Sequence, residues 1–239
     1  MTLSGISSMA TKGVLAALAD AAASAGAPTI AFESVGGVLA ADRVAAGEAL
    51  DVVVLASGAI DRLADDGHVD PATRTPLVLS QVAAAVPAGD DAADDPDGAT
   101  PPPGPAFAHA SELRAALRAA SRIGYSTGPS GTALVRMIEG WGLSDELSDR
   151  LVQARPGVPV AASLAAAEVD LGFQQLSELV GQPGVRILGV LPDDCAIETV
   201  FTAAVATASG SPRQAAELIA FLASAEASGI KAEHAFRTP

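Results

Sequence analysis

The alternation of short apolar runs with helical patterns over the first 70 residues most constrains the fold. Residues 50–57, Leu-Asp-Val-Val-Val-Leu-Ala-Ser, form the most apolar run. A strand that is apolar at successive positions is typical of a parallel sheet covered on both faces. Two earlier runs also resemble strands, and the three helical patterns that follow the runs span residues 10–26, 37–48 and 59–69. This alternation of strand and helix patterns predicts an α/β fold with a doubly wound parallel sheet.

A second alternating unit follows the long apolar segment 75–86. Its predicted strands span residues 122–127, 169–175, 184–192 and 198–206, with helical patterns between and after them. Two such units predict two lobes joined by two crossing strands, near 76–86 and 198–206, with a cleft between the domains. We expect lobe 1 to comprise residues 1–82 with 207–239, and lobe 2 residues 83–206.

The segment 88–105 is rich in Asp, Pro and Gly, a composition typical of a solvated loop. We expect it at the surface, either as a lid or partner-binding loop or as an insertion without a role.

The charge and the Cys and His content exclude several classes of function. The formal net charge of −14 argues against nucleic acids and anionic membranes as partners, because both favour Lys and Arg. A small anion remains possible, because helix N-termini carry partial positive charge. The single cysteine and three dispersed histidines argue against a metal site, and no cofactor is predicted. No membrane insertion is expected, since no run approaches the roughly 20 apolar residues of a spanning helix.

The N-terminus lacks a basic region followed by a long apolar run, so the chain as written is expected in the cytoplasm. If a signal peptide has been removed from it, the expected location is the periplasm.

Turns between a strand end and a helix start are the main candidate binding elements. The three that stand out are Ser7-Ser8-Met9, Ser34-Val35-Gly36 and Ser130-Gly131-Thr132. Ligands of open α/β sheets bind beyond the carboxyl ends of the strands, where such turns lie. Ser57 and Ser80 are further candidate ligand-binding residues. The alternative is that these Ser and Thr residues are ordinary helix caps, worth about 1 kcal/mol each.

The stretch Asp-Leu-Gly-Phe-Gln-Gln-Leu-Ser-Glu-Leu, residues 170–179, is unusually polar for this Ala-rich chain. Gln174, Gln175 and Ser177 could bind a carboxylate or hydroxyl group. Glu178 could act as a general base if it is partly buried, or it could simply complement the dipole of the following helix. For proton transfer the candidate catalytic residues are Ser8, Lys12 and Glu178. No glycine-rich nucleotide motif is present.

The layout resembles the type II periplasmic-binding-protein fold, in particular the molybdate-binding family. The resemblance covers nearly the whole chain and rests on residues 34–57, 128–138, 165–179 and 215–236. Residues 34–57 are similar to that family's Ser-x-Gly turn, helix and Ala-Gly-x-x-x-Asp-Val run. The early Ser-Ser-Met turn and the Gln-Gln pair differ from molybdate receptors. They resemble a divergent branch that includes aconitate isomerase.

Two functions follow from the resemblance. The first is binding of a small organic polycarboxylate in the cleft between the lobes, with isomerisation by an allylic proton shift. The alternative is a non-catalytic solute receptor of an ABC transporter, for a molybdate-like oxyanion or a carboxylate, with closure of the lobes on the ligand. A transporter would be a partner only if the chain is exported. A cytoplasmic sensor has no support beyond the acidic segment.

Overall fold

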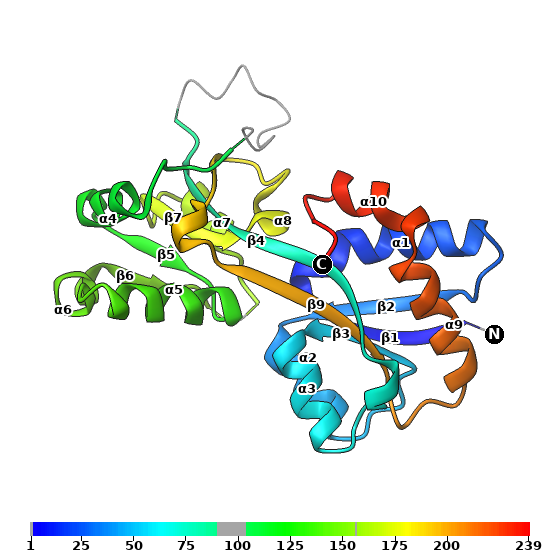
Figure 1. Cartoon of the computed structure of the whole chain (residues 1–239). Helices are drawn as coiled ribbons and strands as arrows, with labels where there is room; N and C mark the ends of the chain where they lie inside the picture. Colours follow the sequence, from blue (N-terminus) through cyan, green and yellow to red (C-terminus); the bar gives the residue numbers. More distant parts are fainter. Residues whose placement is uncertain (1, 90–103, 156) are drawn as a thin grey trace. The chain divides into compact units, whose positions relative to one another are not determined.

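The computed structural model describes residues 2–89, 104–155 and 157–239, and they form two compact units (Figure 1). Unit 1 comprises the described residues up to Ser80 together with Thr199–Pro239, and unit 2 comprises those of Gln81–Glu198. The chain passes between the units inside β4 (Thr75–Pro87) and at the start of β9 (Glu198–Val205). The two predicted crossing strands are therefore confirmed. Most of the acidic segment 88–105, from residue 90 to 103, lies outside the described residues.

Unit 1 is built on parallel strands with helices on both faces. Strands β1 (Leu3–Ser8), β2 (Ile30–Val35) and β3 (Val52–Ala56) run parallel in the order β2-β1-β3, and β9 pairs antiparallel with β3. The helices are α1 (Lys12–Ser24), α2 (Gly37–Ala45), α3 (Ser57–Asp65), α9 (Pro212–Ala223) and α10 (Ser228–Glu233). In Figure 1, α1 and α10 lie on one side of these strands, and α2 and α3 lie on the other.

Strand β3 shows why both faces of this sheet are covered. Its residues Val52 to Leu55 are all buried, and successive side chains of a strand point to opposite faces. Val52 and Val54 belong to the apolar cluster that contains residues of α1 and α9, whereas Val53 and Leu55 belong to the cluster that contains residues of α2 and α3. The expectation of a strand buried on both faces is confirmed.

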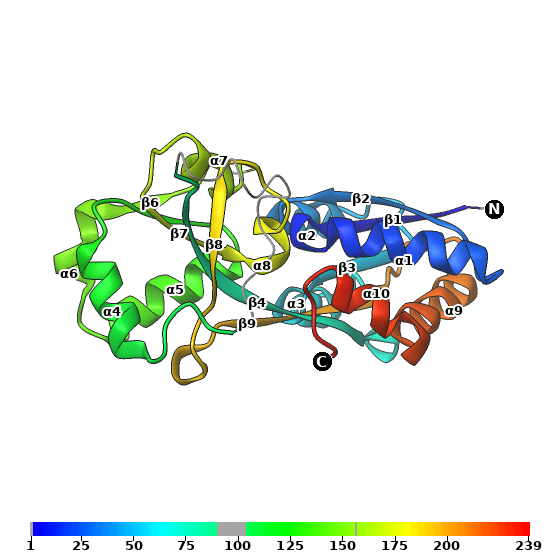
Figure 2. The same ribbon diagram turned by 90° about the horizontal axis from the view of Figure 1, so that it is seen from above.

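Unit 2 repeats the parallel arrangement with shorter strands. Strands β5 (Ile123–Tyr125), β6 (Leu151–Gln153) and β7 (Leu171–Gln175) run parallel in the order β7-β5-β6. β4 pairs antiparallel with β7 and with β8 (Val185–Val190). The helices are α4 (Ala110–Ala119), α5 (Pro129–Gly140), α6 (Ser144–Leu147), α7 (Val160–Ala165) and α8 (Leu176–Leu179). Figure 2 shows the same elements from above.

Glycines allow α7 to pack closely on the sheet of unit 2. A Cβ atom at Gly172 of β7 would lie 2.8 Å from a methyl carbon of Val160 and 2.8 Å from one of Leu164. Only a residue without a side chain fits there. The opposite face of the sheet packs against α4 and α5, whose Leu117 and Leu134 are fully buried. Across the described part of the chain, no helix is long and apolar enough to cross a membrane.

Asp51 ties the start of β3 to β1 and to the loop before α9. Its carboxylate accepts hydrogen bonds from the Ser4 N–H at 2.9 Å and from the Ser209 hydroxyl at 2.6 Å. Partial burial acts to raise the pKa of Asp51, but the hydrogen bonds from Ser209 and Ser4 outweigh it and lower the pKa below its usual value. Because the folded pKa is the lower one, this contribution to stability is present above the unfolded pKa of about 3.9 and is lost as the pH falls through the folded value.

We expect Asp51→Asn to lower the free energy of unfolding at pH 7 by roughly 1 kcal/mol, since a partly exposed charged acceptor is lost. The deficit should shrink when urea unfolding is repeated near pH 3, where the wild-type carboxylate itself begins to protonate. The control is Asp65→Asn, at an exposed position at the end of α3. Equal deficits at both pH values would contradict the assigned role.

Candidate functional site

The first two predicted turns lie side by side in unit 1. Parallel pairing of β1 with β2 sets Ser7 opposite Ser34 and Ser8 opposite Val35. The hydroxyl oxygens of Ser7 and Ser34 are 2.8 Å apart, and Ser7 is fully buried. The structure therefore brings two turns, 27 positions apart in sequence, to one edge of the sheet.

The hydroxyl groups of these turns do not cap the helices that follow. Ser8 precedes the 3₁₀ turn Met9–Thr11, and Gly36 precedes α2, and neither position has a side-chain cap hydrogen bond within the described residues. The first N–H groups of a helix have no partner inside it. Serine hydroxyls therefore lie beside two helix starts at this edge of the sheet, an arrangement that suits an anion.

Other predicted residues of unit 1 differ in how accessible they are. Met9 is 41% exposed, and Lys12 is exposed at the start of α1. Ser57 follows β3, but its hydroxyl lies 2.7 Å from the Thr202 hydroxyl and 3.0 Å from the carbonyl oxygen of Val200, so β9 already engages it.

Ser80 in β4 is completely buried. Its hydroxyl oxygen has no hydrogen-bond partner among the described residues.

The third predicted turn opens α5 in unit 2. The hydroxyl oxygens of Ser126 and Ser130 are 2.9 Å apart, and Ser130 is buried. Thr132 is exposed, and its hydroxyl donates to the Gly128 carbonyl at 3.4 Å. No side chain caps this helix within the described residues, since its N-cap is Gly128.

Gly131 has a packing role in addition to the ligand-binding role that its position suggests. A glycine at a helix start is expected to let a ligand approach the backbone. Here a Cβ atom would overlap the carbonyl oxygen of Ser126 and would lie 3.1 Å from the Tyr125 ring. The absent side chain therefore lets the turn fold back on itself.

The end of β7 carries the most polar buried cluster of unit 2. Gln174 and Gln175 are each 3% exposed. The side-chain amide oxygen of Gln174 accepts a hydrogen bond from the N–H of Ala161, in the first turn of α7, at 3.3 Å. Ser177 and Glu178 follow in α8 and are partly buried.

The pKa of Glu178 is close to neutral pH. Burial raises its pKa to about 7, and a hydrogen bond from the Gln174 side chain opposes the rise. A carboxyl group with this pKa is populated in both protonation states at neutral pH, as general acid–base chemistry requires.

Arg155 is a cation near the candidate site that the sequence analysis did not single out. It follows β6 by two residues, and the N–H of the intervening Ala154 donates to the Tyr125 carbonyl at 2.8 Å. This bond places Arg155 at the carboxyl edge of β5 and β6, where the turn Ser126–Ser130 begins. No strand was predicted at residues 151–153, so the only sequence signal for Arg155 is that it is one of only 14 Lys and Arg residues in the chain.

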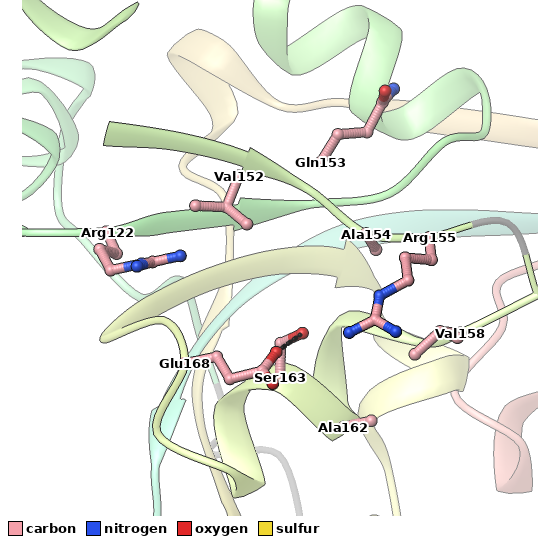
Figure 3. Close-up of a pocket in the computed structure, with 9 residues that line it drawn as sticks. All are labelled: Arg122, Val152, Gln153, Ala154, Arg155, Val158, Ala162, Ser163 and Glu168. Carbon is pink, nitrogen blue, oxygen red and sulfur yellow. Dashed lines mark hydrogen bonds between the residues drawn. The ribbon is translucent and has the colours of Figure 1, made fainter. Parts of the chain in front are cut away.

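The Arg155 side chain points into a hollow between β6 and α7 (Figure 3). Arg122 lies at the far end of this hollow, and Gln153 points away from it. The Ser163 hydroxyl donates to the Glu168 carboxylate at 3.1 Å on the α7 side. The lining residues are Arg122, Val152, Gln153, Ala154, Arg155, Val158, Ala162, Ser163 and Glu168. No group of three or more His, Cys, Asp or Glu side chains that could hold a metal ion occurs among the residues that the structure describes.

The model of one protein family, bacterial extracellular solute-binding protein, matches residues 3–237. The chain belongs to this family. A curated relative, the aconitate isomerase of a Pseudomonas species, is 32% identical over 186 residues, which are 78% of this chain and 66% of that protein. The match thus spans just under two thirds of the relative's length.

Solved structures show the same fold. The periplasmic molybdate-binding protein of Azotobacter vinelandii is 18% identical with a TM-score of 0.76, and the match covers 99% of each chain. The substrate-binding domain of a molybdenum ABC transporter from Clostridium difficile is 16% identical with a TM-score of 0.72, covering 100% of this chain and 99% of that one. The predicted α/β fold, of the two-lobed type II periplasmic-binding-protein class, is confirmed.

The packing of Gly131 gives a direct test of the third turn. We expect Gly131→Ala to lower the free energy of unfolding by about 1–3 kcal/mol, because the new methyl group must displace the backbone of the turn. Gly140→Ala, in the last turn of the same helix, meets no atom within 4 Å and should be neutral or slightly stabilising. Urea unfolding measures both, and equal effects would show that Gly131 is not constrained by its packing.

Proposed function

We propose that this protein binds a small organic polycarboxylate and isomerises it by an allylic proton shift, as an aconitate-isomerase-like enzyme. The observation that carries the proposal is Glu178, a carboxyl group whose pKa is raised to about 7 in the donor-rich part of unit 2. The 32% identity to an aconitate isomerase supports the same reaction class.

The reaction needs one group that removes a proton and one that returns it. In the proposed first step, the Glu178 carboxylate takes a proton from the CH₂ carbon next to a substrate carboxylate. The C–H electron pair moves into the allylic system, and negative charge develops on that carboxylate. The double bond then shifts when a proton is delivered to the far carbon of the system. Product and substrate are isomers, so no oxidant, reductant or cofactor takes part.

Each unit by itself offers donor groups for a carboxylate in this proposal. The Ser7-Ser8 and Ser34-Val35-Gly36 turns hold one carboxylate, and their helix starts stabilise its charge. In unit 2 the proposed donors are the start of α5 and, separately, the Arg155 guanidinium, which faces the hollow between β6 and α7. Arg155 is suited to this role because a guanidinium matches the geometry of a carboxylate. Ser8 and Lys12 remain proposed proton carriers for the return step.

The second candidate function is a receptor without chemistry. Its specific support is the family itself, whose model covers residues 3–237 and describes extracellular solute-binding proteins. In this case the chain binds a carboxylate or a molybdate-like oxyanion in the periplasm and delivers it to an ABC transporter. The donor groups would be the same, and Glu178 would have no proton to transfer.

Incubation with trans-aconitate in D₂O distinguishes the two functions. An isomerase gives the isomer with deuterium at the reprotonated carbon, detected by ¹H NMR, whereas a receptor binds without any exchange. The saturated analogue propane-1,2,3-tricarboxylate has no allylic system, so its affinity, measured by calorimetry, reports binding alone. Binding of molybdate in place of both acids would support the receptor and contradict the isomerase.

We expect Glu178→Gln to reduce kcat by about 10²–10⁴-fold, the range of a lost general base. Affinity for propane-1,2,3-tricarboxylate should be retained or improved, because a negative charge has been removed. In the wild type, kcat/KM should rise through pH 7 as Glu178 ionises and then level off. The control is Glu139→Gln, at an exposed position in α5. Full activity in Glu178→Gln would remove Glu178 from the mechanism.

We expect Arg155→Ala to raise the Kd for propane-1,2,3-tricarboxylate about tenfold or more, the effect of losing a charge-assisted hydrogen bond. The melting temperature should change little, because Arg155 is exposed. Arg186→Ala, an exposed arginine of β8, removes the same charge and should leave the Kd almost unchanged. If both variants weaken binding equally, only the net charge matters and Arg155 is not a ligand.

A further inference from the structure

The hollow between β6 and α7 exists because α7 packs on the two neighbouring strands. A Cβ atom at Gly124 of β5 would lie 3.0 Å from a methyl carbon of Val160, the first residue of α7, and one at Gly172 of β7 would lie closer still. The helix therefore covers β5 and β7, whereas β6 is the last strand in the order of the sheet. The hollow beside β6 has a volume of about 500 Å³, which is within the usual range of small-molecule sites.

Two guanidinium groups line this hollow at its two ends (Figure 3). Arg122 comes one residue before β5 and Arg155 two residues after β6, and Tyr125 at the end of β5 pairs with Gln153 at the end of β6. At about 3.3 Å per residue, the two arginine backbones are separated by at most roughly 16 Å along the strands. Neither guanidinium forms an ion pair with any residue that the structure describes. Each of them is therefore available to a separate anionic group.

A carboxylate lines the α7 side of the same hollow. Glu168 accepts a hydrogen bond from the Ser163 hydroxyl at 3.1 Å, and it forms no ion pair within the described part of the chain. In Figure 3 the side chains of Glu168 and Arg155 point toward one another across the hollow. An ionised carboxylate can accept about four hydrogen bonds, so Glu168 can also hold an ammonium group.

We propose that this hollow is a second binding site, for an acidic amino acid. The α-carboxylate of the ligand pairs with Arg155, its ammonium group with Glu168, and its side-chain carboxylate with Arg122. The hollow carries two positive charges and one negative charge, and an acidic amino acid carries the opposite set. A dicarboxylate without an amine would leave Glu168 facing negative charge, and a neutral amino acid would leave Arg122 without a partner.

Main-chain hydrogen bonds hold both arginines in place without using their side chains. The Asp170 carboxylate accepts hydrogen bonds from the N–H groups of Ser121 and Arg122, each at 2.8 Å. The Val158 N–H donates to the carbonyl oxygen of Arg155 at 3.0 Å. Positions that are fixed before binding reduce the entropy that a ligand must overcome, and the guanidinium groups can form paired hydrogen bonds with its carboxylates.

This second site is independent of the proposed isomerisation. Neither Glu178 nor the serine turns of unit 1 belong to the described residues that line the hollow. Arg155 is common to both proposals, so the tests of the hollow change Arg122 and Glu168 instead. Failure of trans-aconitate to react would leave the amino-acid site standing, and failure of amino acids to bind would leave the isomerase standing.

Calorimetry on the wild type tests the ligand class. L-glutamate is compared with glutarate, which lacks the ammonium group, and with L-glutamine, which lacks the side-chain carboxylate. L-aspartate is compared in the same way with succinate and L-asparagine. We expect one of the two acidic amino acids to bind about tenfold or more tightly than both of its analogues. If neither binds, or if an analogue binds equally well, the proposal is wrong.

Two variants test the assigned contacts, and each should abolish one preference only. Glu168→Gln should remove the preference over the dicarboxylate without an amine, and Arg122→Ala should remove the preference over the amide. Both side chains are exposed, so the melting temperature should change little. Glu139→Gln and Arg136→Ala remove the same charges from exposed positions of α5 and should keep both preferences. Equal losses in these controls would show that only the net charge matters and would overturn the assignment.

A ¹⁵N spectrum of the wild type locates the ligand without any variant. Adding the amino acid that binds should shift the amide resonances of Val152, Ser163 and Glu168, which line the hollow. Shifts confined to other parts of the chain would place the amino acid elsewhere and contradict the proposal.

Discussion

The parallel register that sets Ser7 against Ser34 determines what unit 1 can bind. Because both strands end at the same edge of the sheet, the helices that follow them start there too. Their first N–H groups have no partner inside the helix, and the residues at the two N-cap positions do not use side chains to satisfy them within the described residues. Two helix starts thus lie together at one edge of the sheet, next to the exposed Lys12 at the start of α1.

Unit 2 offers an anion a basic side chain as well as the N–H groups of a helix start. The bond from the Ala154 N–H to the Tyr125 carbonyl carries Arg155 to the edge where the Ser126–Ser130 turn begins. A helix start is a diffuse donor that suits many anions, whereas a guanidinium can form two parallel hydrogen bonds with a carboxylate or with a tetrahedral oxyanion.

Local pattern was enough to predict the strands of unit 1, the two crossing strands and the fold class. The apolar run at Val52–Leu55 and the spacing of the helical patterns are short-range features. The local pattern could not predict how particular backbone and side-chain groups pack against each other. The Gly131 backbone packs against Ser126 because of a tight turn that no pattern encodes, and Arg155 is important only because β6 pairs with β5. The pKa of Glu178 depends on burial by the folded unit, so the sequence could indicate a carboxylate but not its protonation.

The environment of Glu178 also bears on the choice between receptor and enzyme. An ionised carboxylate beside a bound polycarboxylate repels it, so a receptor would bind more tightly with a neutral group at this position. A carboxyl group whose pKa is about 7 is partly charged at neutral pH, and a protein that only binds gains nothing from that charge. In an isomerase the charged fraction is useful, because the base must be ionised before it can remove a proton. The cost in affinity is then the physical consequence of keeping a base next to an anionic substrate.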